Sequence, residues 1–205
     1  MSDRSLATTC TEGPSPPAGE LAPPEDTLAT TARLAVRVAG ALALAALLIA
    51  LITRVVLAVQ ARRWLAYPFT GVPATPGVAV TIFAHNLRAL LTAGGALLVA
   101  QMSHRARTVP GGFDRVLRLA VDLVLGVAVL ANLVVVGVSF GAYGARMVPA
   151  VLPHGPVELA SYSLALALYL QGRRRRLSGS HVLKVAAVSV ALLALAAALE
   201  TFVNV

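Results

Sequence analysis

The sequence predicts an all-α protein, a polytopic transmembrane helical bundle of about five spans with its amino terminus on the cytoplasmic side. Composition is the first observation: 58% of the 205 residues are hydrophobic and only 13% are charged, which is more apolar surface than a soluble domain of this size can bury. The second observation is that the charged residues stand in short runs between apolar stretches. Most of these stretches have the roughly 20 residues that a helix needs to cross a membrane.

Residues 1–32 are expected to be a disordered cytoplasmic tail, and residues 33–205 the transmembrane domain. The tail is rich in Pro, Thr, Ser and Glu and holds five of the nine acidic residues, so it buries too little apolar surface to offset the entropy lost on folding. It also holds the single cysteine, Cys10, which excludes an intramolecular disulfide and a cysteine-based zinc site. Because no apolar run precedes residue 33, we expect the first span to act as the insertion signal.

Five apolar segments predict the spans, and the fourth is the shortest. They cover residues 38–59, 77–102, 116–140, 156–171 and 182–203. Trp64 and Tyr67 in the connection 64–76 suit a membrane interface, and the prolines of that connection exclude a continuous helix. The connection 141–155 is too polar and too interrupted by glycine and proline to span, so we expect an outer loop there.

Lysine and arginine residues orient the bundle, because cytoplasmic connections of membrane proteins carry an excess of both. With the amino terminus inside, twelve lie on the cytoplasmic side: Arg4, Arg33, Arg37, Arg105, Arg107, Arg115, Arg118, Arg173, Arg174, Arg175, Arg176 and Lys184. The other side holds Arg62, Arg63 and Arg146, with Arg54 near its boundary. The net charge of +8 is therefore interpreted as a topology signal in the cytoplasmic (plasma) membrane, and no nucleic acid is expected as a partner. An alternative role for the run 173–176 is binding of anionic lipid headgroups.

Several polar side chains interrupt the spans, where a central charge costs about 2.5–3.5 kcal/mol on insertion scales and usually faces protein or water. With the predicted orientation, the second and fourth spans both start at the outer face, so their polar groups share one leaflet. Arg88 is the expected ion-pair partner of Glu158, since a lone buried charge would cost far more than a pair. The expected polar cluster comprises His85, Asn86, Arg88, Asn132, His154, Gly155 and Glu158.

Ordinary structural roles stay open for several of these residues. Pro156 suits the first position of a helix, and a carboxylate at Glu158 in the first turn is favoured by the free amides and the macrodipole. Asn132 can serve as an interhelical hydrogen bond, and His85 can be an ordinary hydrogen-bonded histidine.

Two acids and two glycines within the spans have simple expected roles. Asp122 is expected to pair with Arg118, four residues earlier on the same helix. Glu200 lies near the outer end of the fifth span, where it can reach the headgroups. Gly137 and Gly141 form a small-xxx-small spacing, which lets two helices approach closely.

The polar residues recur in a characteristic order along residues 80–172. The most specific piece is Pro153-His154-Gly155-Pro156-Val157-Glu158-Leu159, and the others are His85-Asn86-Leu87-Arg88, Gly94-Gly95, and Asn132 with Gly137. This order resembles the stage II sporulation protein M family, whose Pro-His-Gly-x-x-Glu-Leu element is similar to the first piece. The sequence departs from the family at Leu133, where glycine is common, and at His85, where a second asparagine is usual. The resemblance implies a multi-pass protein of the cytoplasmic membrane that acts with partner proteins.

Three classes of function stay open. The first is a non-enzymatic scaffold or subunit of a membrane complex, with protein partners in the bilayer and with a homo-oligomer as a further option. The second is a membrane-embedded enzyme or enzyme subunit acting on a peptide or lipid-linked substrate, with His154, Glu158 and His85 as catalytic candidates for acid–base chemistry. The third is a transporter or channel component. No cofactor or metal is expected, and a zinc site built from the same three residues lacks a recognised ligand spacing.

Overall fold

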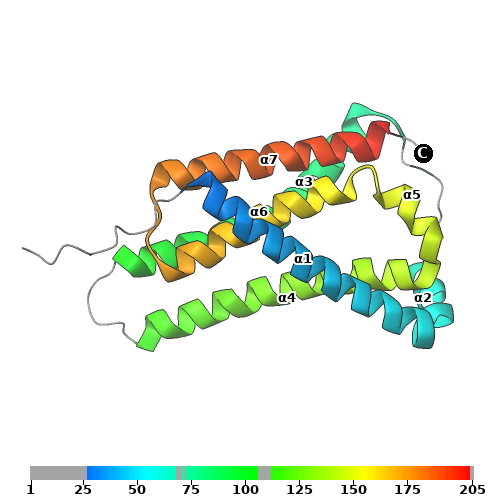
Figure 1. Ribbon diagram of the computed structural model, residues 1–205, viewed down its shortest axis with the longest axis horizontal. Coiled ribbons are helices and arrows are strands. Elements are labelled where there is room, and N and C mark those ends of the chain that lie inside the picture. The colour runs from blue at the N-terminus through cyan, green and yellow to red at the C-terminus, as the bar shows by residue number, and fades with distance from the viewer. Residues whose placement is uncertain (1–26, 68–70, 72, 106–111, 204–205) are drawn as a thin grey trace, which may run out of the picture.

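The computed structural model describes residues 27–67, 71, 73–105 and 112–203, and these form a bundle of helices without a strand (Figure 1). Five long helices run along the same axis and alternate in direction. They are α1 (Leu28–Ile52), α3 (Pro76–Arg105), α4 (Gly112–Tyr143), α6 (Gly155–Arg174) and α7 (Gly179–Phe202). Shorter elements extend α1 and α4: the π-helix η1 (Thr53–Leu57), α2 (Ala58–Leu65), the 3-10 helix η2 (Gly144–Arg146) and α5 (Met147–Val151). The prediction of an all-α bundle is confirmed.

Four helical stretches are long and apolar enough to cross a membrane, which makes this a multi-pass membrane protein. They are Leu28–Leu65, Pro76–His104, Arg115–Val151 and Gly179–Phe202. Large apolar side chains cover the outside of the bundle, as Leu47, Leu123 and Leu183 illustrate. Such a surface is stable against lipid and not against water.

Helix α6 coincides with the fourth predicted segment but is more polar than the other four long helices. Its 20 residues span about 30 Å, which is the thickness of the hydrocarbon core. It packs against α1, α3 and α7, and its small polar residues face those neighbours. Ser161 and Ser189 are buried, and the Ser161 hydroxyl donates to the Ser189 carbonyl oxygen at 2.8 Å. The short apolar length of the segment therefore reflects a helix enclosed by protein.

Three predicted boundaries are wrong. Helix α1 begins at Leu28, after Thr27 caps it by accepting from the Thr30 amide, so residues 28–32 are helical and not part of a tail. The prediction of a disordered tail over residues 1–26, including Cys10, lies outside the described residues. Most of the expected outer loop 141–155 is helical, and Trp64, which was expected in the connection 64–76, lies in α2. The end of α4 packs on α2, where the Arg62 Nε donates to the Ala142 carbonyl oxygen at 2.6 Å.

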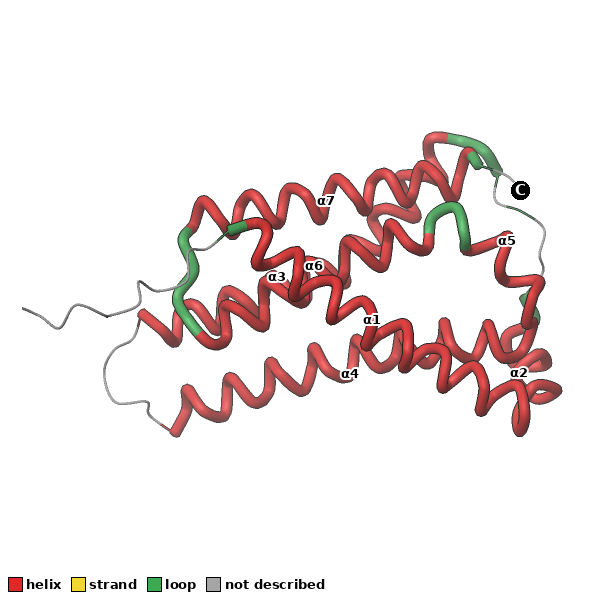
Figure 2. Tube along the Cα trace, viewed as in Figure 1, coloured by secondary structure: helices red, strands yellow, loops and turns green. Residues whose placement is uncertain are grey.

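Most of the described basic residues lie at one end of the bundle, as the alternating direction of the spans predicts. The starts of α1, α4 and α7 and the ends of α3 and α6 lie together at one end of the bundle (Figures 1 and 2). That end carries most of the described basic residues: Arg33, Arg37, Arg115, Arg118, Arg173, Arg174, Arg175, Arg176 and Lys184. We call it the basic end, and the end that carries η2 and α5 the opposite end.

A polar network at the basic end ties α1, α3, α6 and α7 together. The fully buried Thr31 hydroxyl donates to Gln171 Oε1 at 2.9 Å and lies 3.0 Å from His181 Nε2. Gln101 Nε2 donates to the carbonyl oxygens of Gly172 and Arg175, and Gln101 Oε1 accepts from the Leu177 amide. These bonds satisfy the carbonyl groups at the end of α6, which a helix leaves without internal partners. This network was not predicted, because isolated polar residues near a span end resemble interfacial ones.

Helices α1 and α4 cross with almost no space between their backbones. A Cβ added at Gly137 would meet Ile49 Cβ at 2.7 Å, and one added at Gly141 would meet the Ala50 carbonyl oxygen at 2.5 Å and Thr53 Cβ at 2.6 Å. The small-xxx-small interpretation of these two glycines is therefore confirmed. This crossing provides the main contact of α4 with the rest of the bundle.

We expect Gly141→Ala to destabilise the bundle by about 1–3 kcal/mol, the usual cost of overpacking a tight contact. Gly126→Ala on the same helix is the matched control, because its added Cβ has no neighbour within 4 Å and alanine is the better helix former. Thermal unfolding in detergent, followed by circular dichroism, measures both. A Gly141→Ala protein that melts at or above the temperature of Gly126→Ala would contradict the close crossing.

Candidate functional site

The candidate site lies where α3, α6 and α7 approach the opposite end, and its centre is the pair Glu158 and Tyr162. These two residues are four positions apart on α6 and therefore share one face. The Tyr162 hydroxyl donates to Glu158 Oε1 at 3.1 Å, and the Asn86 carbonyl oxygen of α3 lies 3.4 Å from the same hydroxyl. Glu158 stands in the first turn of α6, as the capping interpretation predicts, and its hydrogen bond among the described residues is to Tyr162. Sequence reasoning missed Tyr162, although its spacing from Glu158 was available.

His154 and Glu200 form the second part of the site. His154 Nε2 lies 4.0 Å from Glu200 Oε2 of α7, so Glu200 faces the bundle and the expectation that it reaches the headgroups is wrong. His154 Nδ1 is buried, and no group among the described residues hydrogen-bonds to it. Burial lowers the pKa of His154, although the Glu158 carboxylate acts in the other direction. His154 is therefore mainly neutral at pH 7.

Two of the predicted residues approach the centre, and one helps to form the turn before α6. His85 and His154 are close enough to Glu158 for their charges to act on its carboxyl group. Gly155 occupies a tight turn, since a Cβ there would meet Val151 Cγ1 at 2.5 Å. His154, Gly155 and Glu158 of the motif 153–159 therefore all lie in this part of the bundle. The predicted gathering of α3 and α6 polar groups at one end is correct in these respects.

Arg88 does not pair with Glu158, and that prediction is wrong. Among the described residues, Arg173 forms an ion pair with Asp122 and His154 lies beside Glu200, whereas Arg88 is exposed on the outer face of α3. Two residues along an α-helix correspond to a rotation of about 200°. Since Asn86 contacts α6, Arg88 must face away from it.

Asn132 and Asp122 also differ from their predicted contacts. The Asn132 amide donates to the Ala128 carbonyl oxygen of its own helix at 2.9 Å, so it does not join two helices by this bond. Asp122 pairs with Arg173 of α6 at 2.5 Å and also accepts from the Tyr169 hydroxyl. The predicted pairing of Asp122 with Arg118 is therefore wrong. Asp122 instead connects α4 to α6 at the basic end.

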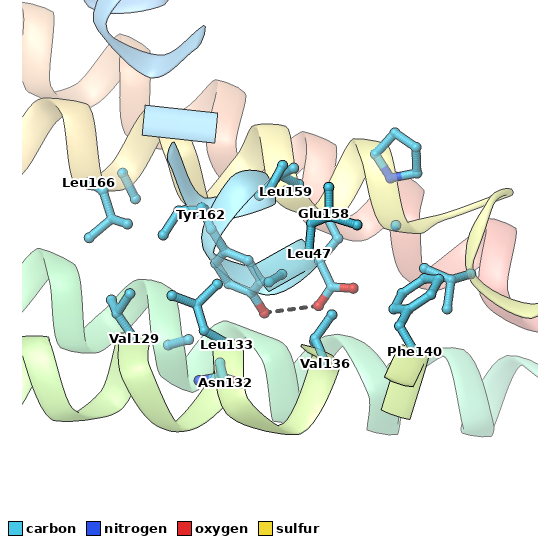
Figure 3. Close-up of a pocket in the computed structure, with 18 of the residues that line it drawn as sticks. Leu47, Val129, Asn132, Leu133, Val136, Phe140, Glu158, Leu159, Tyr162 and Leu166 are labelled. Carbon is cyan, nitrogen blue, oxygen red and sulfur yellow. Dashed lines mark hydrogen bonds between the residues drawn. The ribbon is translucent and has the colours of Figure 1, made fainter. Parts of the chain in front are cut away.

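An apolar cavity of about 610 Å³ lies beside this centre, between α4 on one side and α1 and α6 on the other. Figure 3 shows Glu158 and Tyr162 extending from α6 toward α4, with Leu133 and Val136 facing them. Three polar side chains line the cavity, those of Asn132, Glu158 and Tyr162. A carboxyl and a phenol in contact are able to donate and accept protons or hydrogen bonds in an environment that excludes water.

The residues present do not fit a metal ion. No three histidine, cysteine, aspartate or glutamate side chains within the described ranges come together as a ligand set. The zinc alternative built on His85, His154 and Glu158 is therefore not supported by their geometry.

We expect Tyr162→Phe to destabilise the protein by about 1–2 kcal/mol, because it removes the hydrogen bond that Tyr162 donates to the Glu158 carboxyl inside the bundle. Thr81→Val is the control, since among the described residues the Thr81 hydroxyl donates to the Gly77 carbonyl oxygen of its own helix and to no other helix. Thermal unfolding in one detergent compares the two variants. Equal melting temperatures would mean that the α3–α6 contact does not depend on Tyr162.

Comparison of the chain with protein-family models, with curated proteins and with solved structures found no match. The site is therefore described from its own geometry, and the resemblance in the order of its polar residues stays a prediction.

Proposed function

We propose that this protein is a non-enzymatic subunit of a multi-pass complex in the cytoplasmic membrane, with its amino terminus in the cytoplasm. The observation that carries the proposal is Arg88, an exposed arginine near the middle of the span Pro76–His104 whose side chain has no ion pair among the described residues. A charge in that position normally faces protein or water. We infer that another protein covers it.

The depth of Arg88 argues against contact with the headgroups. It lies two residues before the midpoint of the 29-residue span, which is about 3 Å along the helix axis. With a hydrocarbon core about 30 Å thick, the nearest headgroup region is more than about 10 Å away. Leaving the charge in lipid costs about 2.5–3.5 kcal/mol or more, and a partner carboxylate removes most of that cost.

The partner is inferred to carry an acidic residue in a transmembrane helix. A second copy of this chain is a poor source, because each acid in its described spans is turned toward the inside of its own bundle. Asp122 pairs with Arg173, Glu200 lies beside His154, and Glu158 bonds to Tyr162. A different protein with an exposed aspartate or glutamate at mid-membrane depth fits the charge of Arg88.

Two further observations support the proposal. The basic residues gather at one end of the bundle, as expected for the cytoplasmic end. The order of polar residues resembles the stage II sporulation protein M family, which implies action with partner proteins in the cytoplasmic membrane.

A membrane-embedded enzyme is the second candidate. Glu158 and Tyr162 face a cavity that is large enough for part of a substrate, and His154 lies next to them. In that case Glu158 and His154 would exchange protons with a peptide or lipid-linked substrate.

We expect Arg88→Leu to weaken assembly of the complex by about 2–5 kcal/mol, because the partner's carboxylate is left unpaired in the membrane. Arg63→Leu is the matched control, since Arg63 is exposed in α2, close to the end of the stretch Leu28–Leu65. Native electrophoresis in mild detergent measures the fraction of chain in the complex.

A photo-crosslinker at the exposed Leu91, one turn from Arg88 on α3, should then label a partner helix that contains aspartate or glutamate. A chain that runs as a lone bundle in mild detergent would contradict the proposal. A crosslinked product of two copies of this chain would replace the different partner with a homo-oligomer.

We expect Glu158→Gln to keep both the complex and function in cells, because the new carboxamide oxygen still accepts from Tyr162. An acid–base enzyme would assemble normally and lose about 10²–10⁴ in rate. The measurement is complementation of a strain that lacks the gene, together with the yield of complex. Lost complementation with an intact complex would favour the enzyme.

A further inference from the structure

We propose that the cavity between α4 and α6 binds one hydrocarbon chain of a membrane lipid, with an uncharged hydrogen-bonding group of that lipid beside Glu158 and Tyr162. This site is separate from the α3 face around Arg88 and does not depend on the proposed partner.

The shape of the cavity selects a single chain. It extends along α4 from Leu125 to Phe140, which are 15 residues apart and therefore about 22 Å apart along the axis. A volume of about 610 Å³ over about 22 Å gives a mean cross-section of about 28 Å². An extended hydrocarbon chain fits a space of this length and volume.

The walls match a lipid chain in chemistry and in access. Leucine, valine and alanine side chains of α1, α4 and α6 make up most of the lining, so water would find few of the hydrogen-bond partners that it needs. Leu47 and Val136 both line the cavity and are exposed, which means that the cavity opens onto the outer surface. In a membrane, that surface is in contact with lipid chains.

The polar side chains along the wall add a point of recognition. Among the described residues, the hydrogen bond to the Glu158 carboxyl comes from Tyr162 alone, through Oε1, so Oε2 is available to a ligand. Asn132 uses its amide nitrogen on Ala128, and its Oδ1 can accept. A hydroxyl or amide group of a lipid would satisfy these atoms, which otherwise lie unsatisfied against hydrocarbon.

The test uses the full chain in phosphatidylcholine vesicles that contain a diacylglycerol with a diazirine in the middle of one acyl chain. After irradiation, mass spectrometry maps the labelled residues. We expect labels on the cavity residues Val129, Leu133 and Val136 above those on Leu123 and Val134, which are exposed on other faces of the same helix.

Ala128→Trp fills the cavity from its α4 wall, and Val127→Trp adds the same side chain at an exposed position next to it. We expect Ala128→Trp to lower labelling of the cavity residues about tenfold or more, a loss of about 1.4 kcal/mol in binding, and Val127→Trp to leave it unchanged. Size-exclusion chromatography and thermal unfolding check that both variants fold.

If the unsubstituted chain is labelled no more strongly in the cavity than on Leu123 and Val134, the proposal is overturned. So would a folded Ala128→Trp protein with undiminished cavity labelling. If Ala128→Trp does not fold, the map of the unsubstituted chain decides by itself. Loss of the complex in Arg88→Leu with normal lipid labelling would separate this site from the proposed assembly.

Discussion

The bundle depends on a polar helix, α6, whose polar groups are satisfied by the helices packed against it. Helix α6 carries serine, tyrosine, glutamine and glutamate side chains that would be costly in contact with hydrocarbon. It is therefore enclosed by α1, α3 and α7, and its polar groups bond to those helices at both ends. Ser161 reaches the backbone of α7, Gln171 reaches Thr31 of α1, and Tyr162 reaches the backbone of α3. The arrangement of the other four long helices, which are more apolar, follows from the need to satisfy these polar groups.

Helix α4 is held differently, and that difference creates the cavity. It approaches α1 through Gly137 and Gly141, where backbone meets backbone, and it reaches α6 through Asp122 at the basic end. Between these two attachments, α4 and α6 are separated, and large apolar side chains face the space from both sides (Figure 3). A close crossing and an ion pair thus leave an elongated apolar site between α4 and α6.

The candidate site was only partly predictable. The motif 153–159 and the starts of the second and fourth spans correctly placed His85, His154 and Glu158 near one another, because helix direction follows from counting spans. The proposed pairing of Arg88 with Glu158 failed, since it depends on how α3 is rotated about its axis. Glu200 and Tyr162 were not included for the same reason: their contacts depend on which face of α6 and α7 turns inward.

The sequence by itself determined the class, the number of long helices and their alternating direction. Those properties depend on the length of apolar runs and the placement of basic residues, which act locally along the chain. Only the tertiary structure decided which helix lies inside, which side chains meet and where the cavity opens. Helices such as α3 and α7 are apolar on nearly every face, so no hydrophobic periodicity marks the face that packs inward. That choice is made by close packing of small residues and by satisfaction of the few polar groups, which are properties of the assembled bundle.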